Sequence, residues 1–422
     1  MGVRDLTDLA NASDRRPGAG REARDRAREL RRPRQSTSDR PFIVIWEATQ
    51  ACPLACLHCR ASARPQRDPY ELTTSEAVDL MAQVAQFGRP APLFVITGGD
   101  PFQRPDLTTL IRRGTDLGLA VSVSPSGTPT LTREALAALR DAGARAISLS
   151  VDAAGPAAHD GFRGVDGVYA LTMRAWHDAA NLGLKVQINT TVTRDTLHDL
   201  PQIAAQVRDR GAMLWSVFFL VPTGRGRALP GLGAADTEDV LNILYDLGET
   251  IPVKTTEAHH FRRVCLQRAV LARRGVPAVE ALGLGPLYRR LRQELDELGL
   301  LDGPCRTRRP PLQVSAGNGF VFVSHRGQVH PSGFLPVAGG DVRRQRLVDI
   351  YRTAPLFTDL RDTTLLQGRC GACEFRTVCG GSRARAYAVT GNLHAEEPAC
   401  SYQPGSFAYP DDLAELLPQK PL

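Results

Sequence analysis

The sequence contains few lysines, few aromatic residues and no long apolar run. Only Lys185, Lys254 and Lys420 are lysines, so arginine supplies nearly all of the positive charge, and aromatic residues make up 6% of the chain. No stretch approaches the roughly 18 consecutive apolar residues of a membrane-spanning helix. The N-terminus also has no apolar segment of the kind that a secretory signal needs. These absences predict a protein without membrane partners.

The basic residues do not indicate a nucleic-acid-binding surface either. The net charge is +7, and residues 1–40 hold eleven Arg against seven Asp or Glu. No compact pattern of basic and aromatic residues follows them, so the excess of arginine looks like a bias of composition. We expect no nucleic-acid partner. Residues 1–40 are predicted to be a disordered Arg-rich extension, because they lack an apolar period.

The cysteines are too few and too unevenly placed for a disulfide framework. There are nine, an odd number, and seven of them lie in two groups. Thiolates that are grouped in this way hold metal in a reducing compartment, so the expected location is cytoplasmic.

The first group is Cys52, Cys56 and Cys59, directly after an apolar run at 42–46. Three thiolates on one loop leave one iron of a cubane cluster without a protein ligand, and a small molecule can coordinate there. A structural zinc site normally has four protein ligands, and His58, the nearby candidate, lies between two of the cysteines. The spacing therefore favours an iron–sulfur cluster over zinc.

Cys52-x3-Cys56-x2-Cys59, with a ring side chain before the last cysteine, resembles the defining motif of the radical S-adenosylmethionine (SAM) superfamily. The resemblance implies a catalytic [4Fe–4S] cluster on these three cysteines, with SAM on the open iron. It implies reductive cleavage of SAM to a 5′-deoxyadenosyl radical, which abstracts hydrogen from a substrate. An electron donor such as a flavodoxin or ferredoxin is then the expected partner.

From residue 41 onward, short apolar runs alternate with amphipathic segments of helical length. Strands are predicted at 42–46, 93–97, 120–124, 146–151, 186–192 and 214–221, with helices at 75–87, 107–117, 133–142, 169–182 and 200–210. Strands that alternate with helices pair in parallel through right-handed crossovers. The predicted fold class is therefore α/β, with a partial (β/α)6 barrel of the TIM type at 41–225. Its chemistry is expected at the carboxyl ends of the strands.

Candidate SAM contacts follow several of these strands. The turn after the second strand resembles the family's GGEP-like motif, which implies that Gly98, Gly99, Asp100 and Pro101 hold the SAM amino group. Phe162-Arg163-Gly164 resembles FRG segments of relatives that place an arginine near the SAM carboxylate. The resemblance therefore implies that Arg163 contacts this carboxylate, which a guanidinium matches in bidentate fashion. Further candidates are Ser124, Ser150 and Asp152 at strand ends and Asn189 on the fifth predicted strand. Outside the GG turn, an ordinary role in turns or caps stays open for these residues.

Residues 226–303 are predicted to be a helical bridge. Within it, 254–264 resembles a stretch of the radical SAM proteins of haem biosynthesis, which would bring Arg262 and Arg263 to propionate groups. The alternative is the start of a helix with a solvated basic face.

Residues 304–422 are predicted to form a small α+β iron–sulfur domain. Segments 318–323 and 328–335 predict a hairpin. The second cysteine group resembles the SPASM extension, which carries auxiliary [4Fe–4S] clusters, although four cysteines would also satisfy zinc. It consists of Cys370, Cys373, Cys379 and Cys400.

Two serines limit the number of clusters that this domain is expected to hold. Many relatives carry cysteine where this chain has Ser332 and Ser382. A neutral hydroxyl is a poor iron ligand, so the resemblance implies one auxiliary cluster instead of two.

The substrate is less sharply indicated. The haem-biosynthesis resemblance favours a tetrapyrrole, and the SPASM resemblance suggests modification of a ribosomally synthesised peptide. Residues 1–40 carry no pattern of a winged-helix module that would bind a peptide leader, which slightly favours a tetrapyrrole or another small molecule as the substrate. A non-catalytic iron–sulfur or zinc redox sensor is the alternative outside the enzyme class.

Overall fold

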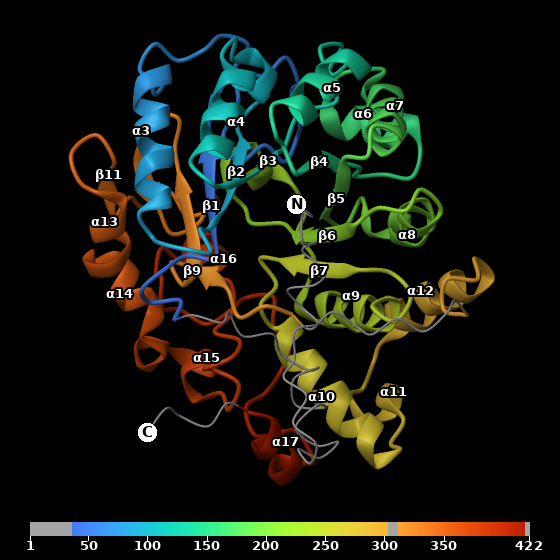
Figure 1. The fold of residues 1–422 in the computed structure, drawn as a ribbon. Coiled ribbons are helices and arrows are strands. Elements are labelled where there is room, and N and C mark those ends of the chain that lie inside the picture. Colours follow the sequence, from blue (N-terminus) through green and yellow to red (C-terminus); the bar gives the residue numbers. More distant parts are fainter. Residues whose placement is uncertain (1–35, 303–310, 418–422) are drawn as a thin grey trace, which may run out of the picture.

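The computed structural model describes residues 36–302 and 311–417, in which a single eleven-stranded sheet organises the chain. The predicted N-terminal extension lies outside the described residues up to residue 35. Along the sheet the order is β11-β10-β9-β1-β2-β3-β4-β5-β6-β7, with β8 paired to β9. The sheet curves without closing, and helices cover its outer side (Figure 1). The predicted α/β class and partial barrel are confirmed.

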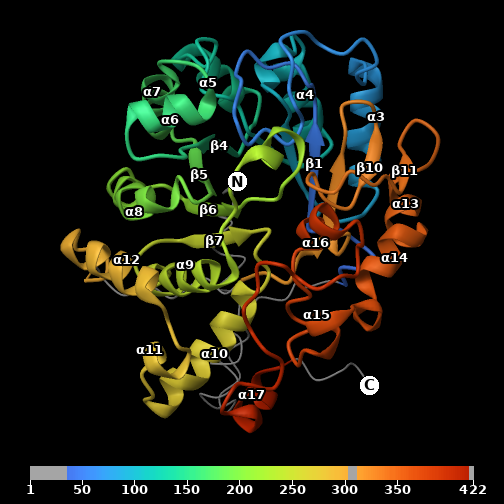
Figure 2. The ribbon, with the colours of Figure 1, turned by 180° about the vertical axis from the view of Figure 1, so that it is seen from behind.

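The barrel strands are parallel and follow chain order from β1 to β7. They are β1 (Ile43–Glu47), β2 (Leu93–Thr97), β3 (Ala120–Val123), β4 (Ala146–Ser150), β5 (Lys185–Val192), β6 (Leu214–Phe219) and β7 (Val253–Thr256). Between them lie α3 (Thr74–Ala85), η1 (Pro101–Gln103), α4 (Leu107–Asp116), α5 (Arg133–Asp141), α6 (Pro156–Arg163), α7 (Val168–Asn181), η2 (Leu197–Asp199), α8 (Leu200–Asp209), η3 (Gly224–Ala228) and α9 (Ala234–Leu247). Figure 2 shows this half from behind.

Local sequence explains where these helices begin. Thr73 and Glu76 form a reciprocal capping box at α3, and Thr132 accepts from the Ala135 N–H at α5. Each cap satisfies backbone donors that a helix start leaves without partners.

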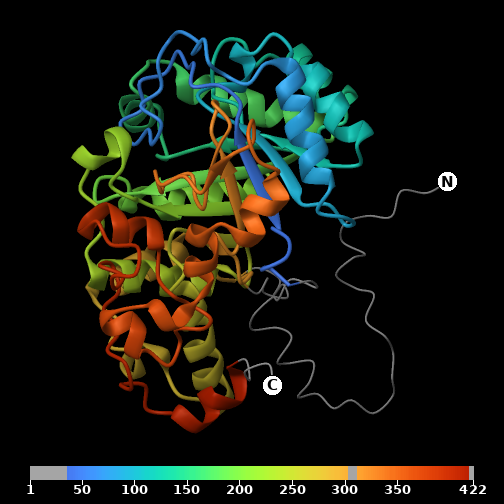
Figure 3. The same ribbon diagram turned by 90° about the vertical axis from the view of Figure 1, so that its left-hand side faces the viewer.

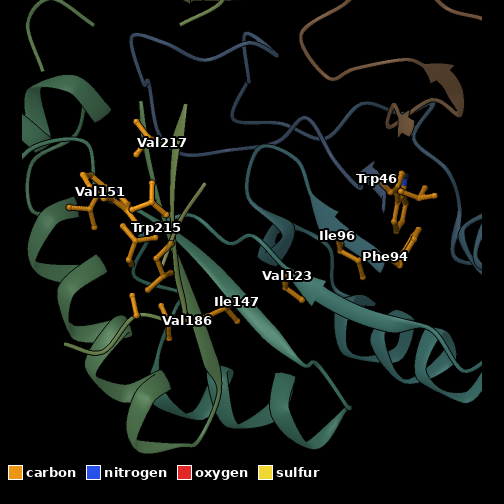
Figure 4. Packing of buried hydrophobic residues seen from close by; sticks show 14 of the residues in the cluster. Trp46, Phe94, Ile96, Val123, Ile147, Val151, Val186, Trp215 and Val217 are labelled. Atoms are coloured by element: carbon orange, nitrogen blue, oxygen red, sulfur yellow. The ribbon is translucent and has the colours of Figure 1, made fainter. Parts of the chain in front are cut away.

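The core lies between the sheet and the surrounding helices. Trp46 on β1, Phe94 on β2 and Trp215 on β6 are fully buried, and Figure 4 shows them with aliphatic residues of the intervening strands. Alternate residues on the inner side are polar and half-buried, as Ser150 and Asn189 illustrate. The strands thus bury apolar side chains against helices and present polar ones to the barrel interior.

The seventh strand, β7, was not predicted. It pairs in parallel with β6 and lies inside the predicted helical bridge. Its sequence, Val-Lys-Thr-Thr, has no apolar run, so periodicity gives no signal for it. The rest of the bridge is helical: α9, then α10 (Phe261–Arg274), α11 (Ala278–Ala281) and α12 (Pro286–Glu297).

The C-terminal segment, residues 311–417, joins the same sheet. β9 pairs in parallel with β1 and antiparallel with β10, which confirms the predicted hairpin. Helices then descend below the barrel strands (Figure 3, orange to red). The elements are β8 (Ser315–Ala316), β9 (Gly319–Val323), β10 (Gln328–His330), β11 (Gly340–Asp341), α13 (Leu347–Thr353), α14 (Pro355–Arg361), η4 (Thr363–Leu365), α15 (Gly368–Ala372), α16 (Arg383–Thr390) and α17 (Pro410–Leu416).

Among the described helices, none combines the length and the apolar character that crossing a membrane requires.

Candidate active site and auxiliary site

The three cysteines of the first group lie on the loop after β1, at the carboxyl end of the strands. Cys52 and Cys56 are buried, Cys59 is half-buried, and the three belong to one packed group of side chains. Cys52 Sγ accepts from the Leu54 N–H at 3.4 Å, and Cys59 Sγ accepts from the Ala63 N–H at 3.4 Å. Burial raises the pKa of Cys52 to about 11, so its thiolate depends on a metal for stabilisation. Clustered thiols with backbone N–H donors fit an iron–sulfur cluster.

Contacts from α6 hold the middle of this loop. The Leu57 N–H donates to the Phe162 carbonyl at 2.9 Å. The His58 ring, which is the ring side chain before the last cysteine, stacks on Phe162 with centroids 4.5 Å apart and planes 9° apart. Burial lowers the pKa of His58 to about 4, so the stack involves a neutral imidazole.

Arg225, in η3 after β6, holds the same loop. Its segment, 221–226, follows the sixth predicted strand and is a candidate for backbone contacts to the adenine of SAM, but the role of the Arg225 side chain was not predicted. Its Nε donates to the Cys56 carbonyl at 2.8 Å and an Nη donates to the Ala63 carbonyl at 3.2 Å. Its backbone N–H donates to the Cys59 carbonyl at 3.0 Å. Gly224 permits this approach, since a Cβ there would lie 2.4 Å from the Cys59 carbonyl oxygen. The signal in the sequence was an arginine between two glycines after the sixth strand.

The predicted Gly98–Gly99 turn packs directly against the start of the cysteine loop. A Cβ on Gly98 would lie 2.3 Å from the Thr49 carbonyl oxygen, and a Cβ on Gly99 would lie 2.3 Å from the Ala51 carbonyl oxygen. The Gly99 N–H donates to Thr49 at 2.8 Å. The glycines therefore permit a close approach of two backbones.

Asp100 is fully buried beside these glycines, and Pro101 begins η1. The Asp100 carboxylate accepts from the Thr128 hydroxyl at 3.0 Å and from the Phe102 N–H at 3.2 Å. Burial raises the pKa of Asp100 above its ordinary value. Its side chain thus orders the turn that packs against the cysteine loop.

Arg163 and Asp152 form a buried ion pair next to the cysteine loop. The Arg163 guanidinium donates to the Asp152 carboxylate and lies 3.7 Å from Cys56 Sγ. Burial opposes its charge, but Asp152 and Cys56 raise the pKa of Arg163 further above its usual value. Asp152 also accepts from the Thr191 N–H at 2.7 Å. The Arg163 Nε has no hydrogen-bond partner among the described residues.

The remaining candidates lie at the ends of β3 and β4 and within β5. Ser124 follows β3 and donates its N–H to the Ile96 carbonyl at 2.9 Å. Ser150 and Asn189 pair across β4 and β5, and both are half-buried. The structure thus brings all of the predicted SAM contacts to one edge of the sheet.

The second cysteine group surrounds a cavity in the C-terminal segment. Cys370, Cys373, Cys379 and Cys400 line it, and all four are half-buried. Burial raises the pKa of Cys373 and of Cys379 to about 12. Within the described ranges, no three side chains of the metal-binding types form a site for one ion, whereas a cubane takes each thiolate on a separate iron. Four cysteines around one cavity fit such a cluster.

Ser332 and Ser382 meet at a buried carboxylate that the sequence did not reveal. The Ser332 hydroxyl donates to one oxygen of Glu257 at 3.0 Å, and the Ser382 hydroxyl donates to the other. Glu257 follows β7 with φ of +57°, which is rare for a residue of this type. Burial raises the pKa of Glu257.

Residues 254–264 connect the barrel to the second cysteine group. Arg262 donates to the Val378 carbonyl at 3.0 Å, and Arg263 donates to the Glu238 carboxylate at 2.9 Å. Both guanidinium groups are buried. The expectation of two arginines free for propionates, and the alternative of a solvated face, are therefore both wrong.

Known proteins similar to this chain bear on its family. The model of the Radical SAM superfamily matches residues 46–207. The AdoMet-dependent heme synthase of Nitratidesulfovibrio vulgaris is 39% identical over 366 residues, which cover 86% of this chain and 92% of that protein. The enzyme of the same name from Methanosarcina barkeri is 37% identical, over 86% of this chain and 97% of that protein.

A solved structure agrees in fold. Streptococcus suis SuiB bound to its precursor peptide SuiA superposes with a TM-score of 0.59 at 14% identity, over 88% of this chain and 76% of that one. Sequence, fold and relatives agree that the cysteine loop is the cluster site of an enzyme. The alternative of a non-catalytic redox sensor is therefore excluded. The chain belongs to the radical SAM superfamily, as an enzyme that uses a [4Fe–4S] cluster and SAM.

Proposed function

We propose that the chain removes a carboxyl group from a propionate side chain of a tetrapyrrole by hydrogen abstraction. The observation that carries the proposal is the likeness to AdoMet-dependent heme synthases, at 39% identity over 92% of one such protein. A second line of support is a Pre-heme d1 synthase, 28% identical over 85% of this chain. Both relatives bear the names of haem-forming enzymes.

The proposed reaction converts a propionate side chain into a vinyl group with loss of CO₂. When bound, the [4Fe–4S] cluster on Cys52, Cys56 and Cys59 and its SAM supply a 5′-deoxyadenosyl radical. A hydrogen atom would pass from the propionate carbon next to the ring to this radical, which gives 5′-deoxyadenosine. The bond from the side chain to the carboxylate would then break, and CO₂ would depart. One electron passes to a one-electron acceptor such as an iron–sulfur cluster, and a vinyl group remains.

The chain's own residues position and shield the reacting groups. We assign the SAM amino group to the backbone of Gly98, Gly99 and Asp100, because the Asp100 side chain is bonded within the turn. Arg163 is assigned to the SAM carboxylate, through the Nε that has no partner in the described structure. Asp152 holds that guanidinium in place as a positioning residue. Ser124, Ser150 and Asn189 remain candidates for contacts to the rest of SAM.

A peptide substrate is the second candidate, supported by a PqqA peptide cyclase of Rhodopseudomonas palustris that is 26% identical over 86% of this chain. The test uses anaerobic protein, dithionite and SAM. Three reactions contain no substrate, a precursor peptide of such a cyclase, or an iron porphyrin with propionates at the haem vinyl positions.

The measured products are 5′-deoxyadenosine and the mass of the porphyrin. We expect loss of CO₂ from the porphyrin, in step with 5′-deoxyadenosine. Cys56→Ala should give neither product. A modified peptide beside an unchanged porphyrin would replace the tetrapyrrole by a peptide, and equal 5′-deoxyadenosine from Cys56→Ala would refute radical chemistry at this loop.

We further propose that residues 304–422 hold one auxiliary [4Fe–4S] cluster, on Cys370, Cys373, Cys379 and Cys400. The bond of Ser332 and Ser382 to Glu257 supports the count, since these two side chains are already paired with a carboxylate. Two cubanes amount to about eight irons per chain. Near twelve irons would contradict the count, and zinc with about four irons would replace the auxiliary cluster by a zinc site.

A further inference from the structure

His260 lines the auxiliary cavity together with the four cysteines. It directly precedes α10, and only 1% of its surface is exposed. Neither ring nitrogen has a hydrogen-bond partner within the described part of the chain. A buried polar side chain without a partner is uncommon and costly, so it calls for a ligand.

The lack of ring hydrogen bonds in the described structure is particular to His260, because the neighbouring histidine has one. His259 is half-buried, and its Nδ1 lies 3.0 Å from the Gly381 carbonyl oxygen and is bonded to it. His260 is held in place by its backbone, since its carbonyl accepts the Val264 N–H at 3.1 Å. The first turn of α10 thus fixes the backbone of a histidine that lines the cavity.

Other donors at this cavity already point at the cysteine sulfurs. The Glu397 N–H donates to Cys370 Sγ at 3.3 Å, and the Gly381 N–H donates to Cys379 Sγ at 3.4 Å. An imidazole carries at least one N–H in every protonation state. The Arg383 guanidinium also donates to Cys370 Sγ, at 3.9 Å. His260 can therefore add an imidazole donor to a set made of backbone N–H groups and this guanidinium.

We propose that His260 donates an N–H hydrogen bond to a sulfur of the auxiliary cluster and thereby raises the cluster's reduction potential. The inference depends on the proposed function only in that the four cysteines hold a [4Fe–4S] cluster. Reduction adds negative charge to the cluster, so a donor to its sulfurs stabilises the reduced form more than the oxidised form. His260 is a positioning and tuning residue in this proposal, without contact to the reacting atoms.

The test isolates the auxiliary cluster in the full chain by Cys52→Ala, Cys56→Ala and Cys59→Ala together. The potential is measured by redox titration followed by electron paramagnetic resonance. In that background, His260→Leu should make reduction about tenfold less favourable, which is ~59 mV to lower potential for one electron. His260→Gln keeps an N–H donor and should recover part of the shift.

The matched control is His330→Phe. His330 lies on β10, is half-buried and has one unpartnered ring nitrogen within the described structure, but it does not line this cavity. The control should leave the potential unchanged. An unchanged potential in His260→Leu, or an equal shift in His330→Phe, would overturn the proposal.

A second measurement detects the hydrogen bond directly and does not depend on a shift in potential. In the same three-alanine protein, labelled with ¹⁵N-histidine, pulsed resonance on the reduced cluster should show a weak histidine coupling that disappears in His260→Gln. Its absence would count against the hydrogen bond. Complete lack of a [4Fe–4S] signal in the three-alanine protein would instead refute the auxiliary cluster itself, so the two failures are distinguishable.

Discussion

Replacing Arg225 by methionine should release the cluster that binds SAM while leaving the auxiliary cluster in place. Methionine keeps much of the length and apolar stem of arginine but has no N–H donor. The change removes the bonds from Nε to Cys56 and from an Nη to Ala63, at 2.8 and 3.2 Å. Both accepting carbonyls belong to the loop that carries Cys52, Cys56 and Cys59.

The magnitude follows from the kind of bond that is lost. A hydrogen bond from a charged donor contributes about 1.5–3 kcal/mol, so two contribute about 3–6 kcal/mol to the ordered loop. Even the lower value corresponds to a weakening of more than about a hundredfold in the retention of the cluster. The backbone bond from Arg225 to Cys59 remains, so the loop should loosen without moving away.

The assay is iron and sulfide content of protein purified without oxygen, together with 5′-deoxyadenosine formation. We expect iron to fall from about eight to about four per chain, because one cubane of two is lost. Arg225→Lys keeps the charge but not the forked geometry, and should give an intermediate value. The control is Arg227→Met, since Arg227 is exposed two residues further on. Full iron content and normal SAM cleavage in Arg225→Met would refute the role of the clamp.

Three further outcomes are expected. Gly99→Ala should reduce 5′-deoxyadenosine formation more than tenfold, because its Cβ would lie 2.3 Å from a loop carbonyl oxygen. The control Gly161→Ala has open space at its Cβ and should cleave SAM normally, so similar rates in both variants would contradict the steric argument. Arg385→Met should lower the free energy of unfolding by about 3–5 kcal/mol, since it leaves the buried Glu397 carboxylate without its salt-bridge partner at 2.9 Å. Anaerobic denaturant titration measures this loss, and the control at an exposed arginine, Arg376→Met, should show none. Iron chelation should abolish SAM cleavage, and activity that survives complete iron removal would exclude a cluster mechanism.

The parts of the site that sequence reasoning found share a local signal. Cys52, Cys56 and Cys59 lie within one short segment, and the Gly98–Gly99 turn directly follows a strand with a clear apolar run. Such patterns can be recognised without any knowledge of tertiary contacts. The barrel followed in the same way, from the alternation of apolar runs and amphipathic segments.

The parts that it missed depend on contacts between distant segments. Arg225 reaches a loop far back in the chain, and Glu257 is paired with serines from two other segments. β7 was not predicted because its residues are mostly polar, and it forms a strand through its pairing with β6. Tertiary pairing overrides local propensity at such positions.

The parallel pairing of β1 with β9 has a consequence for folding of the chain during its synthesis on the ribosome. β1 leaves the ribosome early, whereas β9, at Gly319–Val323, emerges only when most of the chain has been made. Until then β1 has an open edge on one side, and open edges invite pairing with other chains. Non-local pairing of this kind also folds slowly. β1, which precedes the cysteine loop, therefore lacks one of its two pairing partners until the last quarter of the chain is being made. A chain truncated before β9 should aggregate instead of yielding a smaller active barrel.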